Sequence, residues 1–114
     1  MSIKEKRARS IKLINKYAPK GTKIYWNKSR ARCACRYKYC EHLDEFYDYE
    51  IAINIYLAQK LEWAELQKYV IQAIAHTRLP GHKHDNYWLL ECNLLMALIK
   101  EEEKAKEAVE AAAA

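Results

Sequence analysis

The chain is poor in the residues that turn a backbone. Its 114 residues include two Gly and two Pro. A β-sandwich or barrel built from many short strands needs a turn roughly every 8–12 residues. The composition therefore excludes such an architecture and favours a mainly helical fold, and the length allows a single domain over residues 1–114.

Long apolar segments are also missing. Glu91 and Asn93 interrupt the longest candidate, which runs from Tyr87 to Ile99, and no run reaches the roughly 18 residues of a membrane span. The basic N-terminus is not followed by an apolar segment, so it does not read as a secretory signal. We expect no membrane partner, no secretion and a cytoplasmic or nuclear-type reducing compartment. There, four cysteines favour metal ligands or buried thiols over disulfides.

The common sequence signatures of catalysis are absent. Gly21 and Gly81 lie in no phosphate-binding loop, and the chain has neither a Gly-x-Ser-x-Gly elbow nor a His-Glu-x-x-His pair. We therefore predict that the protein is not an enzyme.

Positive charge is concentrated in the first 40 residues. That segment holds 13 Lys or Arg and one acid, Glu5, for a net charge of +12, whereas residues 41–114 hold 7 and 14 for a net charge of −7. Such asymmetry indicates a polyanionic partner for the basic part.

The apolar spacing predicts about four helices. The first, within residues 1–18, opens with a capping box at Ser2 and Glu5 and stops before Pro19. Helical spacing resumes at Leu43, with Asp44 as the cap, and runs to residue 77 with an expected break near residues 60–62. After a breaker at residues 79–81, a last helix begins near Asp85 and extends to about residue 110 as a solvated segment.

Between the first two helices the pattern is that of strands. Residues 22–26 are rich in β-formers, and residues 30–35 alternate charged with small or apolar side chains. We predict a short β-hairpin formed by these two segments.

A cysteine and histidine cluster follows directly. Cys33, Cys35, Cys40 and His42 form the pattern Cys-x-Cys, four residues, Cys-x-His. Three thiolates and one imidazole suit tetrahedral Zn²⁺, and residues i and i+2 of an extended segment point to the same side. The alternatives are a redox or disulfide pair and plain thiols. Four protein ligands would close the zinc shell and leave no position for catalysis.

This motif resembles the SWIM-type zinc finger, whose signature is Cys-x-Cys, a variable spacer and Cys-x-His on a β-hairpin followed by a helix. The match covers residues 22–60, and its four-residue spacer is shorter than the family usually shows. The resemblance implies a zinc-knuckle ββα unit, here set between a basic N-terminal helix and a helical body over residues 62–110. It also implies a DNA-binding or protein-interaction module.

For the remaining cysteine and histidines, structural roles are the preferred interpretation. Cys92 lies on the apolar last helix and is expected in the core, and His76 lies near a helix C-terminus, where its charge is favourable. His82 and His84, together with Asp85, could bind a metal, but a solvated turn that caps the last helix is the preferred interpretation.

Basic and aromatic residues alternate around the cluster, a pattern typical of nucleic-acid binding. We expect DNA more than RNA as the partner of an accessory protein. The predicted phosphate contacts are Arg7, Lys12, Lys23, Lys28, Arg30, Arg32, Arg36 and Lys38. A solvated basic face and acidic protein partners are the alternatives.

The rival function is a zinc-stabilised interaction module without direct nucleic-acid binding. Eleven of the thirteen residues from Tyr87 to Ile99 are apolar, and a helix that is apolar nearly all round lies in a core or in an oligomer interface. A homo-oligomer through this helix is therefore the alternative.

Overall fold

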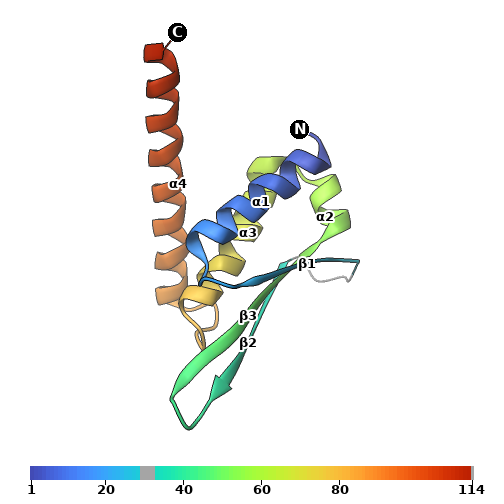
Figure 1. Cartoon of the computed structure of the whole chain (residues 1–114), viewed down its shortest axis with the longest axis vertical. Coiled ribbons are helices and arrows are strands. Elements are labelled where there is room, and N and C mark those ends of the chain that lie inside the picture. The colour runs from blue at the N-terminus through green and yellow to red at the C-terminus, as the bar shows by residue number, and fades with distance from the viewer. Residues whose placement is uncertain (29–32, 114) are drawn as a thin grey trace.

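The computed structural model describes residues 1–28 and 33–113 (Figure 1). It confirms a mainly helical fold with four helices and a small sheet. In chain order the elements are α1 (Ile3–Tyr17), β1 (Lys23–Asn27), β2 (Cys33–Cys40), β3 (Glu45–Asn54), α2 (Ile55–Lys60), α3 (Trp63–Arg78) and α4 (Asn86–Ala113).

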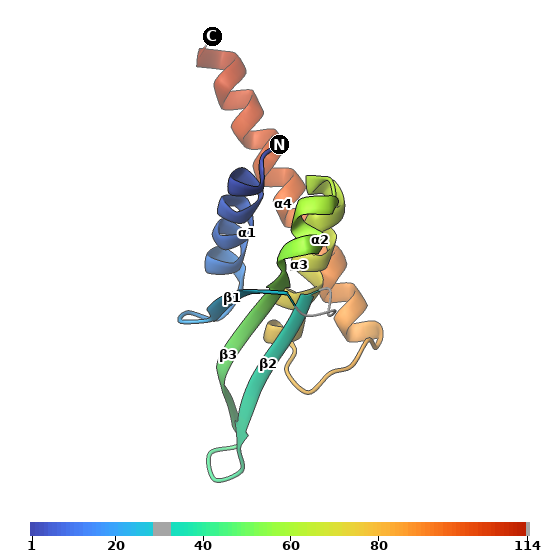
Figure 2. The ribbon, with the colours of Figure 1, turned by 90° about the vertical axis from the view of Figure 1, so that its right-hand side faces the viewer.

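The sheet has three strands in the order β1-β3-β2. β1 runs parallel to β3, and β2 runs antiparallel to it. The hairpin predicted from residues 22–26 and 30–35 is wrong, because β3 lies between the two strands that were expected to pair. The hairpin that does form joins β2 to β3 through the turn at residues 41–44 and projects from the helices (Figure 2).

The prediction of a helix that begins at Leu43 is also wrong, because residues Glu45–Asn54 form the strand β3. Tyr49, Ile51 and Ile53 repeat at every second residue, and these aromatic and β-branched side chains suit a strand that is buried on one face. Asp48 has a φ of +53° where the register with β2 shifts, which marks a β-bulge.

Asp44 is correspondingly not a helix cap. It has a φ of +49° in the turn of the hairpin, and its carboxylate accepts a hydrogen bond from the Tyr39 hydroxyl.

The other helix boundaries agree with the sequence signals. The Ser2 side chain accepts a hydrogen bond from the Glu5 amide at the start of α1. The expected break near residue 61 separates α2 from α3. At the start of α4, Asp85 accepts from the Trp88 amide at 2.9 Å and so acts as the cap.

The core gathers around α3, which buries seven side chains against the sheet and the neighbouring helices. On the sheet, Ile51 and Ile53 of β3 face this core and are fully buried. Ile14 of α1 and Leu95 of α4 close it from the helical side. Burial of these apolar side chains is the main stabilising contribution in such a fold.

The helix α4 packs against α3 with its first half and then extends away from the rest of the chain (Figures 1 and 2). Its side chains beyond residue 99 are exposed up to residue 113. None of the helices in the described part of the chain is long and apolar enough to cross a membrane.

Candidate functional site

The first two cysteines of the motif lie on the inner face of β2. Cys33 pairs with Ile53 and Cys35 with Ile51, so both thiols share the core-facing side of the sheet. Burial raises the pKa of the Cys33 thiol to about 12 and that of Cys35 to about 11. In the absence of a metal both are therefore neutral thiols at physiological pH.

The other two predicted ligands lie at the far end of the hairpin. Cys40 is the last residue of β2 and pairs with Glu45, and His42 is exposed in the turn. Four residues of extended strand lie between Cys35 and Cys40, so five rises of about 3.3 Å place the two about 16 Å apart. The structure thus brings Cys33 and Cys35 together but not the set of four, and the described residues contain no group of three or more potential metal ligands. Zinc binding by this set stays a prediction.

Three of the predicted phosphate contacts lie on the outer face of the sheet. Lys23 of β1 and Arg36 of β2 flank Glu50 of β3 in one row, and Lys38 pairs with Asp48 at 3.4 Å. Opposite charges on neighbouring strands attract one another. Of these three cations, Lys38 is the one that forms an ion pair within the described part of the sheet.

The remaining predicted contacts lie on α1 and at the end of β1. The Arg7 guanidinium lies 4.6 Å from the centroid of the Trp26 ring of β1, and it is partly exposed. Lys12 is exposed on α1, and Lys28 is exposed just after β1. The last two predicted contacts, Arg30 and Arg32, lie outside the described residues.

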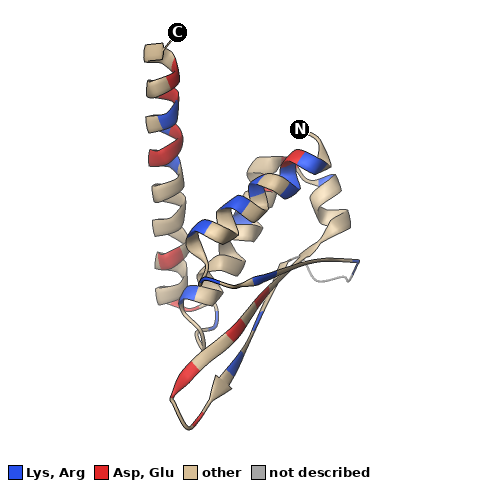
Figure 3. Cartoon of the chain, in the orientation of Figure 1, with Lys and Arg blue, Asp and Glu red and all other residues tan. Residues whose placement is uncertain are grey.

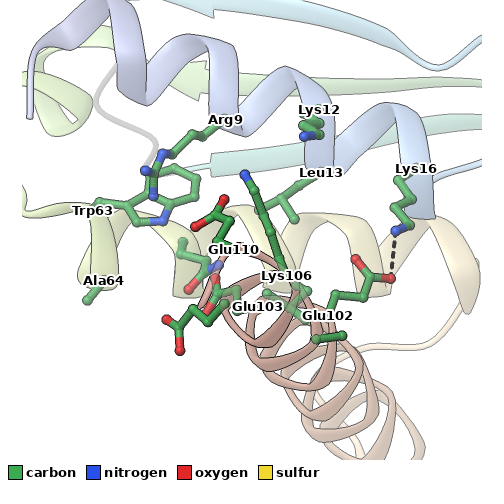
Figure 4. Close-up of a pocket in the computed structure, with 14 residues that line it drawn as sticks. Arg9, Lys12, Leu13, Lys16, Trp63, Ala64, Glu102, Glu103, Lys106 and Glu110 are labelled. Carbon is green, nitrogen blue, oxygen red and sulfur yellow. Dashed lines mark ion pairs between the residues drawn. The ribbon is translucent and has the colours of Figure 1, made fainter. Parts of the chain in front are cut away.

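A groove of about 830 Å³ separates α1 from the outer half of α4 (Figure 4). Its α1 wall carries Arg9, Lys12 and Lys16, whereas its α4 wall carries Glu102 and three further glutamates together with Lys106. Lys16 Nζ lies 2.6 Å from Glu102 Oε1. The acidic residues of the second half of the chain therefore face part of the basic helix within the same molecule.

Tyr17 joins this contact. Its hydroxyl donates to Glu102 at 2.6 Å. Burial, followed by this hydrogen bond, raises the pKa of Tyr17 to about 12. The hydrogen-bonded ion pair with Lys16, followed by the hydrogen bond from Tyr17, lowers the pKa of Glu102. The α4 extension is thus anchored to the end of α1 at Glu102.

Two features of the site could not be found from sequence. The groove joins residues about 90 positions apart, and no local pattern indicates such a contact. His84 meets His76, and not His82, with 3.0 Å between their Nε2 atoms. The cap assigned to Asp85 is observed, and His82 Nδ1 lies 2.7 Å from its second carboxylate oxygen.

Comparison of this chain with protein-family models, with curated proteins and with solved structures finds no match.

Proposed function

We propose that the protein is a small nucleic-acid-binding accessory protein that contacts phosphates through α1 and the adjacent strand β1. The observation that carries this proposal is the unneutralised charge of these two elements. Among their described Lys and Arg side chains, Lys16 is the one within 4.0 Å of a carboxylate. Figure 3 shows the basic residues distributed along the whole length of α1.

Aromatic rings accompany these cations. The Arg7 guanidinium lies over the ring of Trp26, and Tyr25, the preceding residue of β1, is 46% exposed. A guanidinium over an aromatic ring has more N–H donors than that contact uses, and these suit phosphate oxygens. An exposed tyrosine beside such cations can stack on an unpaired base.

The acidic side chains of the groove disfavour the approach of a polyanion to one flank of α1. Glu102 and its neighbours on α4 repel phosphates from the side that carries Arg9 and Lys16. The opposite flank carries Arg7 and leads to β1. We therefore place the proposed interface on Lys4, Arg7 and Lys28, together with Lys23 and Tyr25 on the adjoining outer face of β1. We call these five residues the α1–β1 surface.

Neutralising this basic surface should weaken binding and its salt dependence together. In the triple variant Lys4→Gln, Arg7→Gln, Lys28→Gln, we expect affinity for duplex DNA to fall at least tenfold at about 0.1 M salt. The slope of log K against log salt should decrease by roughly 0.9 for each lost phosphate contact. Fluorescence anisotropy over a salt series, with duplex and single-stranded probes, measures both quantities.

The matched control removes the same charge elsewhere. Lys68→Gln, Lys100→Gln, Lys104→Gln changes three exposed lysines of α3 and α4, and its binding should stay within about threefold of the parent. Equal losses in the two triple variants would mean that net charge alone drives binding. Salt-insensitive or undetectable binding of the parent chain would rule out the proposed function.

A structural zinc ion on Cys33, Cys35, Cys40 and His42 is part of the same proposal. It is supported by the chemistry of the four donors. Because Cys40 lies at the far end of β2, binding by all four would require the end of the hairpin to leave its pairing at Glu45. The proposed zinc therefore couples metal binding to a rearrangement of the hairpin.

Thiol alkylation tests the two states of the cysteines. In zinc-free protein at pH 8 we expect iodoacetamide to modify Cys33 roughly a hundredfold more slowly than free cysteine. Burial raises the pKa of Cys33 to about 12, which lowers its thiolate fraction about a thousandfold, and the greater nucleophilicity of the more basic thiolate offsets about one power of ten. The rate should rise about tenfold per pH unit towards that value while the fold persists. Peptide mapping by mass spectrometry gives the rates.

Metal analysis of the same preparation measures how much zinc is bound per chain and so tests the proposed zinc site. One zinc per chain, with alkylation accelerated by EDTA, would support the proposed ligands. Substoichiometric zinc, with rates that EDTA leaves unchanged, would leave Cys33 and Cys35 as buried thiols.

An exposed apolar stripe on α4 favours a second candidate function, self-association without direct nucleic-acid binding. Tyr87, Leu90, Leu94 and Leu98 are 68%, 63%, 48% and 40% exposed, and their spacing places them on one side of the helix. The core-facing residues, such as Leu95, lie on another side. The helix thus has a second apolar face that no described part of the chain covers.

The stripe predicts a concentration-dependent dimer. In sedimentation equilibrium the double variant Leu90→Gln, Leu94→Gln should weaken association at least tenfold, because it removes apolar area from the contact. Leu89→Gln, at an exposed leucine outside the stripe, should leave it unchanged. A parent chain that stays monomeric at 100 µM, on the order of 10⁻⁴ M, contradicts this candidate.

The two functions separate in one comparison. If the first is correct, the α1–β1 triple variant loses DNA binding whatever its oligomeric state. If the second is correct, that variant keeps its dimer, and no DNA binding is detected for the parent chain.

A further inference from the structure

Three aromatic rings meet where α3 ends and α4 begins. His76 lies on α3, His84 lies in the loop before α4, and Trp88 lies in the first turn of α4. The His84 ring stacks on the indole with a centroid distance of 4.1 Å and an angle of 11°. The His76 ring lies 5.1 Å from the same indole at 28°. One buried tryptophan therefore holds two imidazoles side by side.

The two imidazoles face each other through equivalent nitrogens. His76 Nε2 and His84 Nε2 are 3.0 Å apart. At this distance the two rings share a hydrogen bond, which one nitrogen donates and the other accepts through its lone pair. A metal ion bound between the two nitrogens would replace the shared proton.

We propose that His76 and His84 form a two-histidine binding site for a divalent transition metal of the Ni²⁺ and Cu²⁺ class. Metal–nitrogen bonds to histidine are about 2.1 Å long, and a right angle at the metal then places two ligand nitrogens about 3.0 Å apart. The observed separation of 3.0 Å suits two adjacent positions of a square-planar or octahedral ion.

The surroundings of the pair support this assignment. The indole of Trp88 is buried and stacks on both imidazoles, so it holds the two rings in place. Neighbouring groups that fix the orientation of a histidine ring are a common feature of metal sites.

The neighbouring histidine is held elsewhere. His82 Nδ1 lies 2.7 Å from Asp85 Oδ2, so that ring is engaged by the helix cap. No third His, Cys, Asp or Glu joins the pair within residues 1–28 and 33–113. Water would therefore fill the remaining positions of the ion, and His84 is exposed and open to exchange.

Nickel is the most suitable probe, because unlike Cu²⁺ it does not oxidise the cysteines of the chain. We would titrate the full chain, without a histidine tag, with NiCl₂ by calorimetry and follow tryptophan fluorescence in parallel. In addition to any binding by the cysteine motif, we expect one saturable site whose occupancy quenches the fluorescence of Trp88, which touches the His84 ring. Mg²⁺, which prefers oxygen ligands, should give no signal.

Two variants locate the site. His84→Phe keeps a ring on Trp88 but removes the nitrogen, and it should weaken Ni²⁺ binding at least tenfold with an unchanged circular dichroism spectrum. His82→Gln should stay within about threefold of the parent. Equal binding by the parent and His84→Phe would overturn the proposal. Equal losses in His84→Phe and His82→Gln would also overturn it, because the metal ligands would then be His82 and His84 of the loop and not His76 and His84. A parent chain that gives no saturable Ni²⁺ binding would overturn it as well.

Discussion

Replacing Lys6 by methionine is expected to lower the free energy of unfolding by about 2–4 kcal/mol. Lys6 is the buried cation of α1, with 8% of its surface exposed. Its ammonium group donates to the carbonyls of Leu61 at 2.6 Å and Ala58 at 3.1 Å, and to that of Gln59 at 3.5 Å. Urea denaturation followed by circular dichroism measures the difference.

The size of the effect follows from the position of these carbonyls. They belong to the end of α2, where the last carbonyls of a helix lack partners within the helix and its dipole is negative. A charged donor satisfies them at the point where α1 crosses α2. Methionine keeps most of the length of the side chain, so the loss isolates the hydrogen bonds more than the packing.

Lys4→Met is the matched control for this substitution. It lies on the same helix, and its side chain is exposed, so the change in stability should stay within about 0.5 kcal/mol. If Lys4→Met and Lys6→Met destabilise the chain equally, the junction of α1 and α2 is not held by the Lys6 contacts.

Leu95→Ala should destabilise the protein by about 3–5 kcal/mol. The Leu95 side chain is fully buried, with 0% exposure, in the contact between α4 and the core. Truncating such a leucine removes its transfer free energy and leaves a cavity that the surroundings fill only in part. Thermal and urea denaturation at low protein concentration give the value without a contribution from association.

The adjacent residue provides the control. Leu94 is 48% exposed on the apolar stripe, so Leu94→Ala should change the stability of the monomer by less than about 1 kcal/mol. Similar small effects at both positions would mean that α4 does not dock on α3 through the face described above. Together the pair determines the rotation of α4 about its axis.

The helical part of the fold was largely predictable, because its signals are local. Ser2, Asp85 and Pro19 act through atoms a few residues away, so the boundaries of α1 and the start of α4 follow from the sequence. The side shared by Cys33 and Cys35 was predictable for the same reason, since alternation along a strand needs no distant partner.

The strand β3 was not predictable from spacing alone. Phe46, Tyr49 and Ile53 fit a helical repeat, whereas Tyr49, Ile51 and Ile53 fit a strand. The conflict is resolved by pairing, because β1 and β2 both bond to this segment and bury Ile51 and Ile53 against the helices. Short apolar segments are ambiguous until their partners are known.

The sequence by itself determined the excess of positive charge in the first 40 residues, the four donors of the cysteine motif and the mainly helical class. Only the tertiary structure decided what becomes of these charges and ligands. It buries Lys6, pairs Lys16 with Glu102, separates Cys35 from Cys40 along one strand and brings His76 to His84. Charge and donor chemistry belong to single residues, whereas burial, neutralisation and ligand geometry depend on distances that long-range packing sets.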